Sequence, residues 1–192
     1  MSDRSSRQDL AHRAVIYNSL RQRDNAEIDV RVERYLRAEH HPIVPNSWFA
    51  AASSECIGLF TDGHFYGCIS LCQAVGEALI RFMCQCNQFH PKPDFEANVR
   101  KLKQRKLIDH EFENLCSCLW KYRHDYHHMN QGVETDRQHL EQIALTKIQT
   151  LAELEKWVFQ YSDTHGYVTP KWPKYWPGPE DGKYQVYLRF SP

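Results

Sequence analysis

Apolar side chains recur at helical spacing through the middle of the chain. From Phe65 to Cys86 they alternate steps of four and three residues, and further apolar positions widen the same face. This spacing predicts a long, well-buried central helix, because all these positions lie on one side of a helix. A preceding helix is predicted from a capping residue, Asn46 or Ser47, to Phe60, where a Thr-Asp-Gly-His turn ends it.

Further helices follow the central one. A short helix is expected to begin near Phe95, and Asp109 is the expected N-cap of the next helix. Thr135 opens a Thr-x-x-Gln capping box, after which apolar positions predict a helix to about Ser162, with Gly166 as a stop. The pattern therefore predicts an all-α fold for the middle of the chain.

The first 45 residues form an arm that differs from the helical domain, which we assign to residues 46–165. The arm is highly charged and has apolar positions at helical spacing, which predicts two helices. The segment Ile28-Asp-Val-Arg-Val also alternates, so a short strand stays open there. The run from His40 to Asn46 contains two prolines and predicts a boundary.

The last segment, residues 166–192, is rich in proline and aromatic residues. Its end, from Tyr184 to Phe190, alternates like a short strand, so the tail is expected to contain a strand or a β-hairpin. Bare aromatic side chains would be poorly soluble, so we expect them to pack on the helices or on a second subunit; stacking on an RNA base is the alternative. These aromatic residues are Trp172, Tyr175, Trp176, Tyr184 and Tyr187.

Charge excludes one class of protein and leaves another open. The 24 basic and 24 acidic side chains cancel, so the chain is no general polyanion binder, and any nucleic-acid site must be local. The densest basic run, with Lys121 further along, either forms a solvated helix face or contacts RNA phosphates. The basic residues concerned are Arg100, Lys101, Lys103, Arg105, Lys106 and Lys121.

The expected cellular location decides the expected redox state of the cysteines. The N-terminus has no signal-peptide run, and eighteen apolar residues never follow one another, so we expect a soluble, cytoplasmic protein without membrane contact. In that compartment the seven cysteines are expected to be reduced thiols. A zinc site built from the Cys84/Cys86 and Cys116/Cys118 pairs is a weaker alternative, because residues two apart on a helix point to different faces.

The segment from Lys121 to Asn130, Lys-Tyr-Arg-His-Asp-Tyr-His-His-Met-Asn, carries the most chemistry. Arg123 continues the apolar stripe of the preceding helix, and a buried guanidinium requires an anion or acceptor as partner. Three histidines and an aspartate follow within five residues of it. Glu77, in the middle of the central helix, likewise has to face solvent or pair with a cation.

This motif and the helix order resemble a HEPN domain over roughly residues 46–162. The family signature is an arginine, then a polar residue, then a histidine after four to six intervening residues; Arg123, His124 and His128 match it. The resemblance implies a bundle of four to five helices that dimerises with the two motifs facing each other. It also implies a metal-independent endoribonuclease without a cofactor, and, by analogy, a setting in antiphage or stress defence.

Such cleavage has the ribose 2′-hydroxyl attack its own phosphate, leaving a 2′,3′-cyclic phosphate. It needs a base, an acid and positive charge on the phosphate. Arg123 is assigned phosphate binding and His128 proton transfer, with His124, Asp125 and Glu77 in supporting roles. On an unbroken helix His128 would lie about 140° around from Arg123, while His127 would share its face. Either the helix distorts after Asp125 or His127 does part of the work.

Other readings compete with the nuclease. The three histidines could bind a transition metal, although Arg123 would repel the cation. A HEPN-like module could bind RNA, a nucleotide or a regulatory protein without cleaving, or Arg123 could simply pair with Glu77. In HEPN toxins silenced by nucleotidylation a tyrosine stands two residues after the motif histidine, and this chain has Asn130 there. That departure puts such regulation in doubt.

Overall fold

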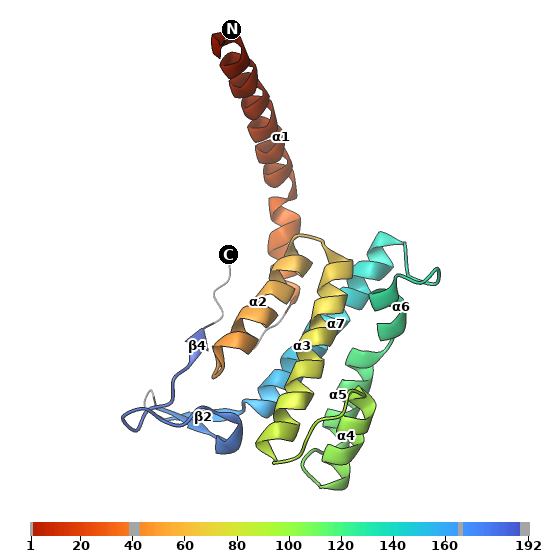
Figure 1. Ribbon diagram of the computed structural model, residues 1–192, viewed down its shortest axis with the longest axis vertical. Helices are drawn as coiled ribbons and strands as arrows, with labels where there is room; N and C mark the ends of the chain where they lie inside the picture. The colour runs from red at the N-terminus through yellow and green to blue at the C-terminus, as the bar shows by residue number, and fades with distance from the viewer. Residues whose placement is uncertain (1, 39–42, 165–166, 189–192) are drawn as a thin grey trace.

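A computed structural model describes residues 2–38, 43–164 and 167–188, with side chains from residue 9 onward. It is mostly helical, with a short strand after the first helix and further short strands in the C-terminal tail, all in antiparallel pairs (Figure 1). The elements are α1 (Ser2–Arg37), β1 (Ile43–Val44), α2 (Ser47–Thr61), α3 (Phe65–Cys86), α4 (Phe95–Gln104), α5 (His110–Trp120), α6 (Arg123–His128), α7 (Arg137–Val158), β2 (Tyr161–Thr164), β3 (Tyr167–Pro170), the 3₁₀ helix η1 (Pro173–Tyr175) and β4 (Tyr187–Leu188).

Helix α3 lies at the centre of the bundle and packs against α2, α4, α5, α6 and α7. Its apolar stripe is buried as predicted, with Ile69, Leu79 and Met83 fully covered. The helix is long and apolar enough to cross a membrane, but 56% of its apolar window is buried inside the protein. The all-α prediction is confirmed for the bundle, and α3 is its core helix.

Side-chain caps set the starts of the helices. Asn46 Oδ1 accepts the N–H of Trp48 at 2.9 Å, and Asp109 Oδ1 accepts that of Phe112 at 2.8 Å, so both predicted caps are confirmed. The predicted capping box of α7 is wrong by one residue, because Asp136 is the cap and accepts the N–H of His139 at 2.9 Å. An aspartate carboxylate competes well with a threonine hydroxyl at this position.

The N-terminal arm has one helix instead of the predicted two, the alternating segment from Ile28 to Val32 is helical, and the short strand β1 follows at Ile43–Val44. Helix α1 runs unbroken from Ser2 to Arg37 because no glycine or proline interrupts it. It rises from one end of the bundle and leaves it (Figure 1). Only its last turns attach: Arg34 pairs with Glu141 at 3.0 Å, and Ala38 is fully buried. The first part of the predicted boundary, residues 39–42, lies outside the described residues.

The tail begins earlier than predicted. Helix α7 ends at Val158 instead of Ser162, because Tyr161 already pairs with Pro170 in the antiparallel β2–β3 hairpin. The predicted stop, Gly166, lies outside the described residues. Within the described part of the strand expected from Tyr184 to Phe190, Tyr187 and Leu188 form β4, which pairs with β1; residues 189 and 190 lie outside the described residues.

The aromatic residues of the tail pack back on the bundle, as expected. Tyr175 and Trp176 are buried, and the Tyr175 hydroxyl accepts a hydrogen bond from Asn87 Nδ2 at 2.9 Å. Trp172 and Tyr184 are partly buried against the core, whereas Tyr187 remains exposed. The tail is therefore part of the folded domain.

One glycine sets the distance between α3 and α5. A Cβ atom on Gly76 would lie 2.1 Å from Leu119 Cδ2, so only glycine allows α5 to approach this closely. Leu119 is itself fully buried. The close approach matters for the site because α5 leads directly into the Arg-His motif.

Gly76→Ala is expected to lower the free energy of unfolding by about 1–3 kcal/mol in a urea titration, because the new methyl group overpacks this contact. Gly67→Ala, also on α3, is the matched control: its Cβ would meet Leu59 at an ordinary 3.6 Å. The control should leave stability unchanged or raise it, since alanine is the better helix former. Equal effects of the two substitutions would contradict the close packing.

Candidate functional site

The helix predicted to carry the motif breaks just before it. Helix α5 ends at Trp120, Tyr122 adopts a left-handed conformation with φ of 66°, and α6 begins at Arg123. The prediction that Arg123 continues the stripe of α5 is therefore wrong, and the distortion comes before Arg123, not after Asp125. The turn changes the direction in which α6 presents its side chains.

Two buried polar side chains hold this turn. Gln73 of α3 donates to the carbonyl oxygens of Leu119 and Lys121 at 3.0 and 3.2 Å. Lys147 of α7 donates from Nζ to the carbonyl oxygens of Cys118 and Lys121 at 2.6 and 2.8 Å. These bonds satisfy acceptors that the end of a helix leaves without partners. Burial lowers the pKa of Lys147 to about 8.

Arg123 lies between an aromatic ring and a carboxylate. Its guanidinium carbon is 4.7 Å from the ring centroid of Trp120, and its Nη2 is 3.8 Å from Glu77 Oε2. Glu77 also lies 3.7 Å from Arg81, so one carboxylate faces two guanidinium groups. The separation of 3.8 Å is longer than a hydrogen bond, and among the described residues the buried Arg123 Nε has no hydrogen-bond partner. The guanidinium therefore retains donors for a ligand.

The three histidines divide into two groups. His124 and His128 are exposed one turn apart on α6, and their ring centroids lie 4.8 Å apart. His127 is partly buried, and its Nε2 makes no hydrogen bond within the described part of the chain. Burial, and after it the charges of Arg123 and His128, lower the pKa of His127 below its usual value. The lowered pKa favours the unprotonated form of His127, which lies one turn after Arg123 on α6.

Contacts at the far end of α6 fix its orientation. Asn130 donates from its backbone N–H to the Asp125 carbonyl at 3.1 Å and from Nδ2 to Asp125 Oδ1 at 3.2 Å. Between them, Met129 adopts a second left-handed conformation with φ of 49°. Tyr126 is buried next to the ring of Tyr66, 6.1 Å away. Asp125 therefore serves α6 as a structural acceptor.

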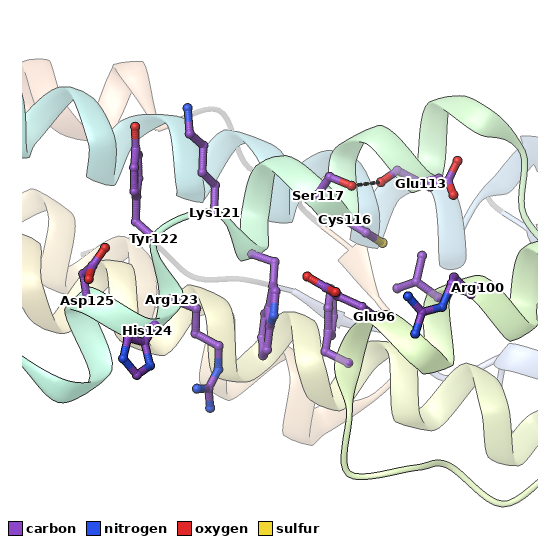
Figure 2. A pocket seen from close by; sticks show the side chains of 13 residues that line it. Glu96, Arg100, Glu113, Cys116, Ser117, Lys121, Tyr122, Arg123, His124 and Asp125 are labelled. Atoms are coloured by element: carbon purple, nitrogen blue, oxygen red, sulfur yellow. Dashed lines mark hydrogen bonds between the residues drawn. The ribbon is translucent and has the colours of Figure 1, made fainter.

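A pocket of about 690 Å³ lies between α4, α5 and the start of α6 (Figure 2). Phe95 and Trp120 stack in it with ring centroids 4.0 Å apart, and since Phe95 covers one face of Trp120, Arg123 takes the other. Charged side chains of both signs line the rest of the pocket. They are Glu96, Arg100, Glu113, Lys121, Arg123, His124 and Asp125.

The predicted RNA-binding residues separate into different surroundings. Arg100 and Lys121 line the pocket. Lys101 and Arg105 instead lie over the ring of Phe89, at 4.7 and 4.9 Å from its centroid. Lys103 is paired with Glu113, while Lys106 is exposed beyond the end of α4. The basic run is therefore no continuous strip along the pocket.

Sequence reasoning missed several residues of this site. Trp120 and Phe95 were not singled out, although Trp120 directly precedes the motif. Gln73 and Lys147 carried a usable signal, because both are polar residues inside helices with strong apolar patterns. Arg81, four residues after Glu77, could have been recognised as a helical ion pair. No group of three metal-ligating side chains gathers in the described ranges.

Raising the pH from 8 to 10 should stabilise the wild type relative to a Lys147→Met variant by about 1–2 kcal/mol in urea unfolding. Over this range the folded protein has released the Lys147 proton, whereas the unfolded chain, with a pKa near 10.5, still binds it. Lys156→Met, on the exposed side of α7, is the control and should show a constant difference from wild type. A constant difference for Lys147→Met as well would contradict its buried position.

No protein-family model, characterised protein or solved structure matches the chain. The HEPN resemblance therefore rests on the motif and on the order of the helices. Any assignment of function has to come from the site, where Arg123 and His124 line the pocket and His127 and His128 follow on the same short helix.

Proposed function

We propose that this protein is a metal-independent endoribonuclease of the HEPN type. It would cleave RNA by attack of the ribose 2′-hydroxyl and leave 2′,3′-cyclic phosphate ends. The observation that carries the proposal is that Arg123 and His127, one turn apart on α6, each have a buried nitrogen that lacks a hydrogen-bond partner among the described residues. Unsatisfied buried polar groups are costly, so their presence together favours a site that a polar ligand completes.

Arg123 is assigned to the phosphate. A guanidinium binds two phosphate oxygens at once and stabilises the charge that develops in the pentacovalent intermediate. Glu77 keeps Arg123 in place as an ion-pair partner, but their separation is too long for Glu77 to accept a hydrogen bond from the guanidinium. A phosphate oxygen, which can approach to hydrogen-bond distance, would compete well for these donors.

Proton transfer is divided between two histidines. His127, with its lowered pKa, is unprotonated near neutral pH and suits the base that removes the 2′-hydroxyl proton. His128 is exposed beside His124 and is assigned the donation of a proton to the leaving 5′-oxygen. The sequence assigned proton transfer to His128 and left open that His127 does part of the work, and this division takes up that alternative.

The pocket next to Arg123 fits an RNA strand. Its volume of about 690 Å³ is in the range of ligand sites, and the stacked Phe95–Trp120 pair forms its apolar wall. Arg100 and Lys121 line the same pocket and would contact neighbouring phosphates. The nucleic-acid contact is local, as the zero net charge requires.

A homodimer in which the two motifs face each other belongs to the proposal. Helix α6 is bracketed by two exposed large side chains, Tyr122 and Met129, next to the exposed His124 and His128. Covering these apolar groups with a second copy would bury them and bring two sets of histidines together. A role in antiphage or stress defence, in the cytoplasm, follows only by analogy with the family.

A non-catalytic module that binds RNA, a nucleotide or a protein partner is the second candidate. The observation in its favour is the Arg123–Glu77 pair, which partly neutralises the arginine within one chain. In this reading the site would bind a phosphate group and leave it intact.

Purified protein is expected to cleave single-stranded RNA in EDTA, and Arg123→Ala should slow cleavage roughly 100-fold or more because it removes the phosphate donors. Arg23→Ala, on the free part of α1, is the matched control and should cleave at the wild-type rate. DNA of the same sequence should resist because it lacks the 2′-hydroxyl. Tight RNA binding by the wild type without any cleavage would establish the module instead.

Separate His127→Ala and His128→Ala variants test the division of roles. Each should lose about 100-fold or more in rate. An RNA with a 5′-bridging sulfur at the cleavage site needs no acid, because the thiolate is a good leaving group. This substrate should restore cleavage by His128→Ala and leave His127→Ala inactive. Rescue of His127→Ala alone would reverse the assignments, and rescue of neither would remove His128 from acid catalysis.

A further inference from the structure

Over most of its length, helix α1 has no packing partner among the described residues of the single chain. Over most of its length it lies away from the bundle (Figure 1), and its large apolar side chains are exposed, with Leu10 at 67%, Tyr17 at 62% and Ile28 at 51%. A helix in water gains most of its stability by packing an apolar face against another element. This helix therefore requires a second element along its length.

One stripe of α1 has the spacing of a helix–helix seam. Its positions follow at steps of three or four residues and lie on the side of α1 next to the one that attaches to the bundle. Apolar residues occupy both ends of the stripe, and two opposite charges occupy its middle. In order, the stripe is Leu10, Ala14, Tyr17, Arg21, Asp24, Ile28, Val32 and Leu36.

The stripe is complementary to itself when reversed. An antiparallel copy brings Tyr17 against Ile28 and Arg21 against Asp24, and it brings the two ends of the stripe together in the same way. For every such pair the two residue numbers add up to 45 or 46, so a single two-fold axis near residue 23 satisfies the whole stripe. An isologous interface has this property, because its two-fold axis makes every contact between two different residues occur twice.

Charge decides between this arrangement and its alternatives. A parallel pair would set Arg21 against Arg21 of the second copy and Asp24 against Asp24. The other apolar face of α1, with Ile16 and Val30, would place Arg23 on the two-fold axis against Arg23 of the second copy. Both arrangements put like charges directly opposite each other. Only the antiparallel stripe opposes unlike charges.

Asp24 is available for this contact. It lies 3.6 Å from Arg31 of its own helix, beyond hydrogen-bond distance, and 55% of its side chain is exposed. Arg31 is itself held by hydrogen bonds to Asp62 at the start of the α2–α3 turn. Asp24 can therefore turn toward a second arginine without releasing the attachment of α1 to the bundle.

We propose that α1 pairs antiparallel with α1 of a second copy of this chain, centred on the Arg21–Asp24 contacts. The helix is 36 residues or about 54 Å long, so the pair holds two bundles at opposite ends of a rod. The two α6 segments of such a pair are too far apart to form one site. This contact is therefore separate from a dimer through the motif, and both together would build a larger assembly.

Sedimentation velocity over a concentration series tests the pairing in charge variants of the full chain. Arg21→Glu sets two carboxylates against each other and should raise the dissociation constant roughly tenfold or more. The double variant Arg21→Glu with Asp24→Lys should restore pairing. Mixing the single variants Arg21→Glu and Asp24→Lys should give a heterodimer. Only a pair made of one chain of each sets unlike charges against each other at these positions. Arg23→Glu, the same charge change on another face, should associate like the wild type.

Two outcomes would overturn the proposal. One is a double variant that pairs no better than Arg21→Glu, because the antiparallel register would then be wrong. The other is equal association of wild type and Arg21→Glu, which would leave only a contact elsewhere, such as one through α6. RNA cleavage is measured separately in the same variants, so failure of the pairing and failure of the nuclease are distinguishable.

Discussion

The buried hydrogen bonds to the end of α5 are the constraint on which the site depends. A helix that stops inside a protein leaves carbonyl oxygens that would otherwise lose their hydrogen bonds to water. Here Gln73 and Lys147 reach these oxygens from two different helices, and Lys121 receives a bond from both. The chain can therefore turn sharply at Tyr122 within the bundle, and the bundle in return fixes where the turn occurs.

This turn gives α6 its chemistry. It places Arg123 over the exposed side of Trp120 and near Glu77 instead of inside the apolar core. It also separates His127, which is partly buried and has a lowered pKa, from His124 and His128, which face solvent. Among these six residues, burial lowers the pKa of His127, the histidine on the shielded side of the helix. Such separation is what an acid–base pair needs, and a continuous helix from α5 would not have produced it.

The assembly that we propose involves two distinct surfaces. The α6 face is small and chemically rich, whereas the α1 stripe is long and carries only apolar and charged side chains. In this proposal the α1 stripe joins two copies without contributing to the chemistry. Contact between two α6 faces would instead complete the catalytic site. Two isologous contacts on one chain lead either to a closed assembly of four copies or to an open chain.

The sequence by itself determined the helices of the bundle and two of their caps. Periodic apolar positions specify α3, and Asn46 and Asp109 cap locally, because a side chain and the N–H groups it binds are three residues apart at most. It also located the motif and the need of Arg123 for a partner. It did not reveal the break at Tyr122, because Gln73 and Lys147, which stabilise it, are 49 residues before and 25 residues after it. Tertiary structure alone decided the turn, the pocket and the separation of the histidines, because each depends on contacts between helices far apart in the chain.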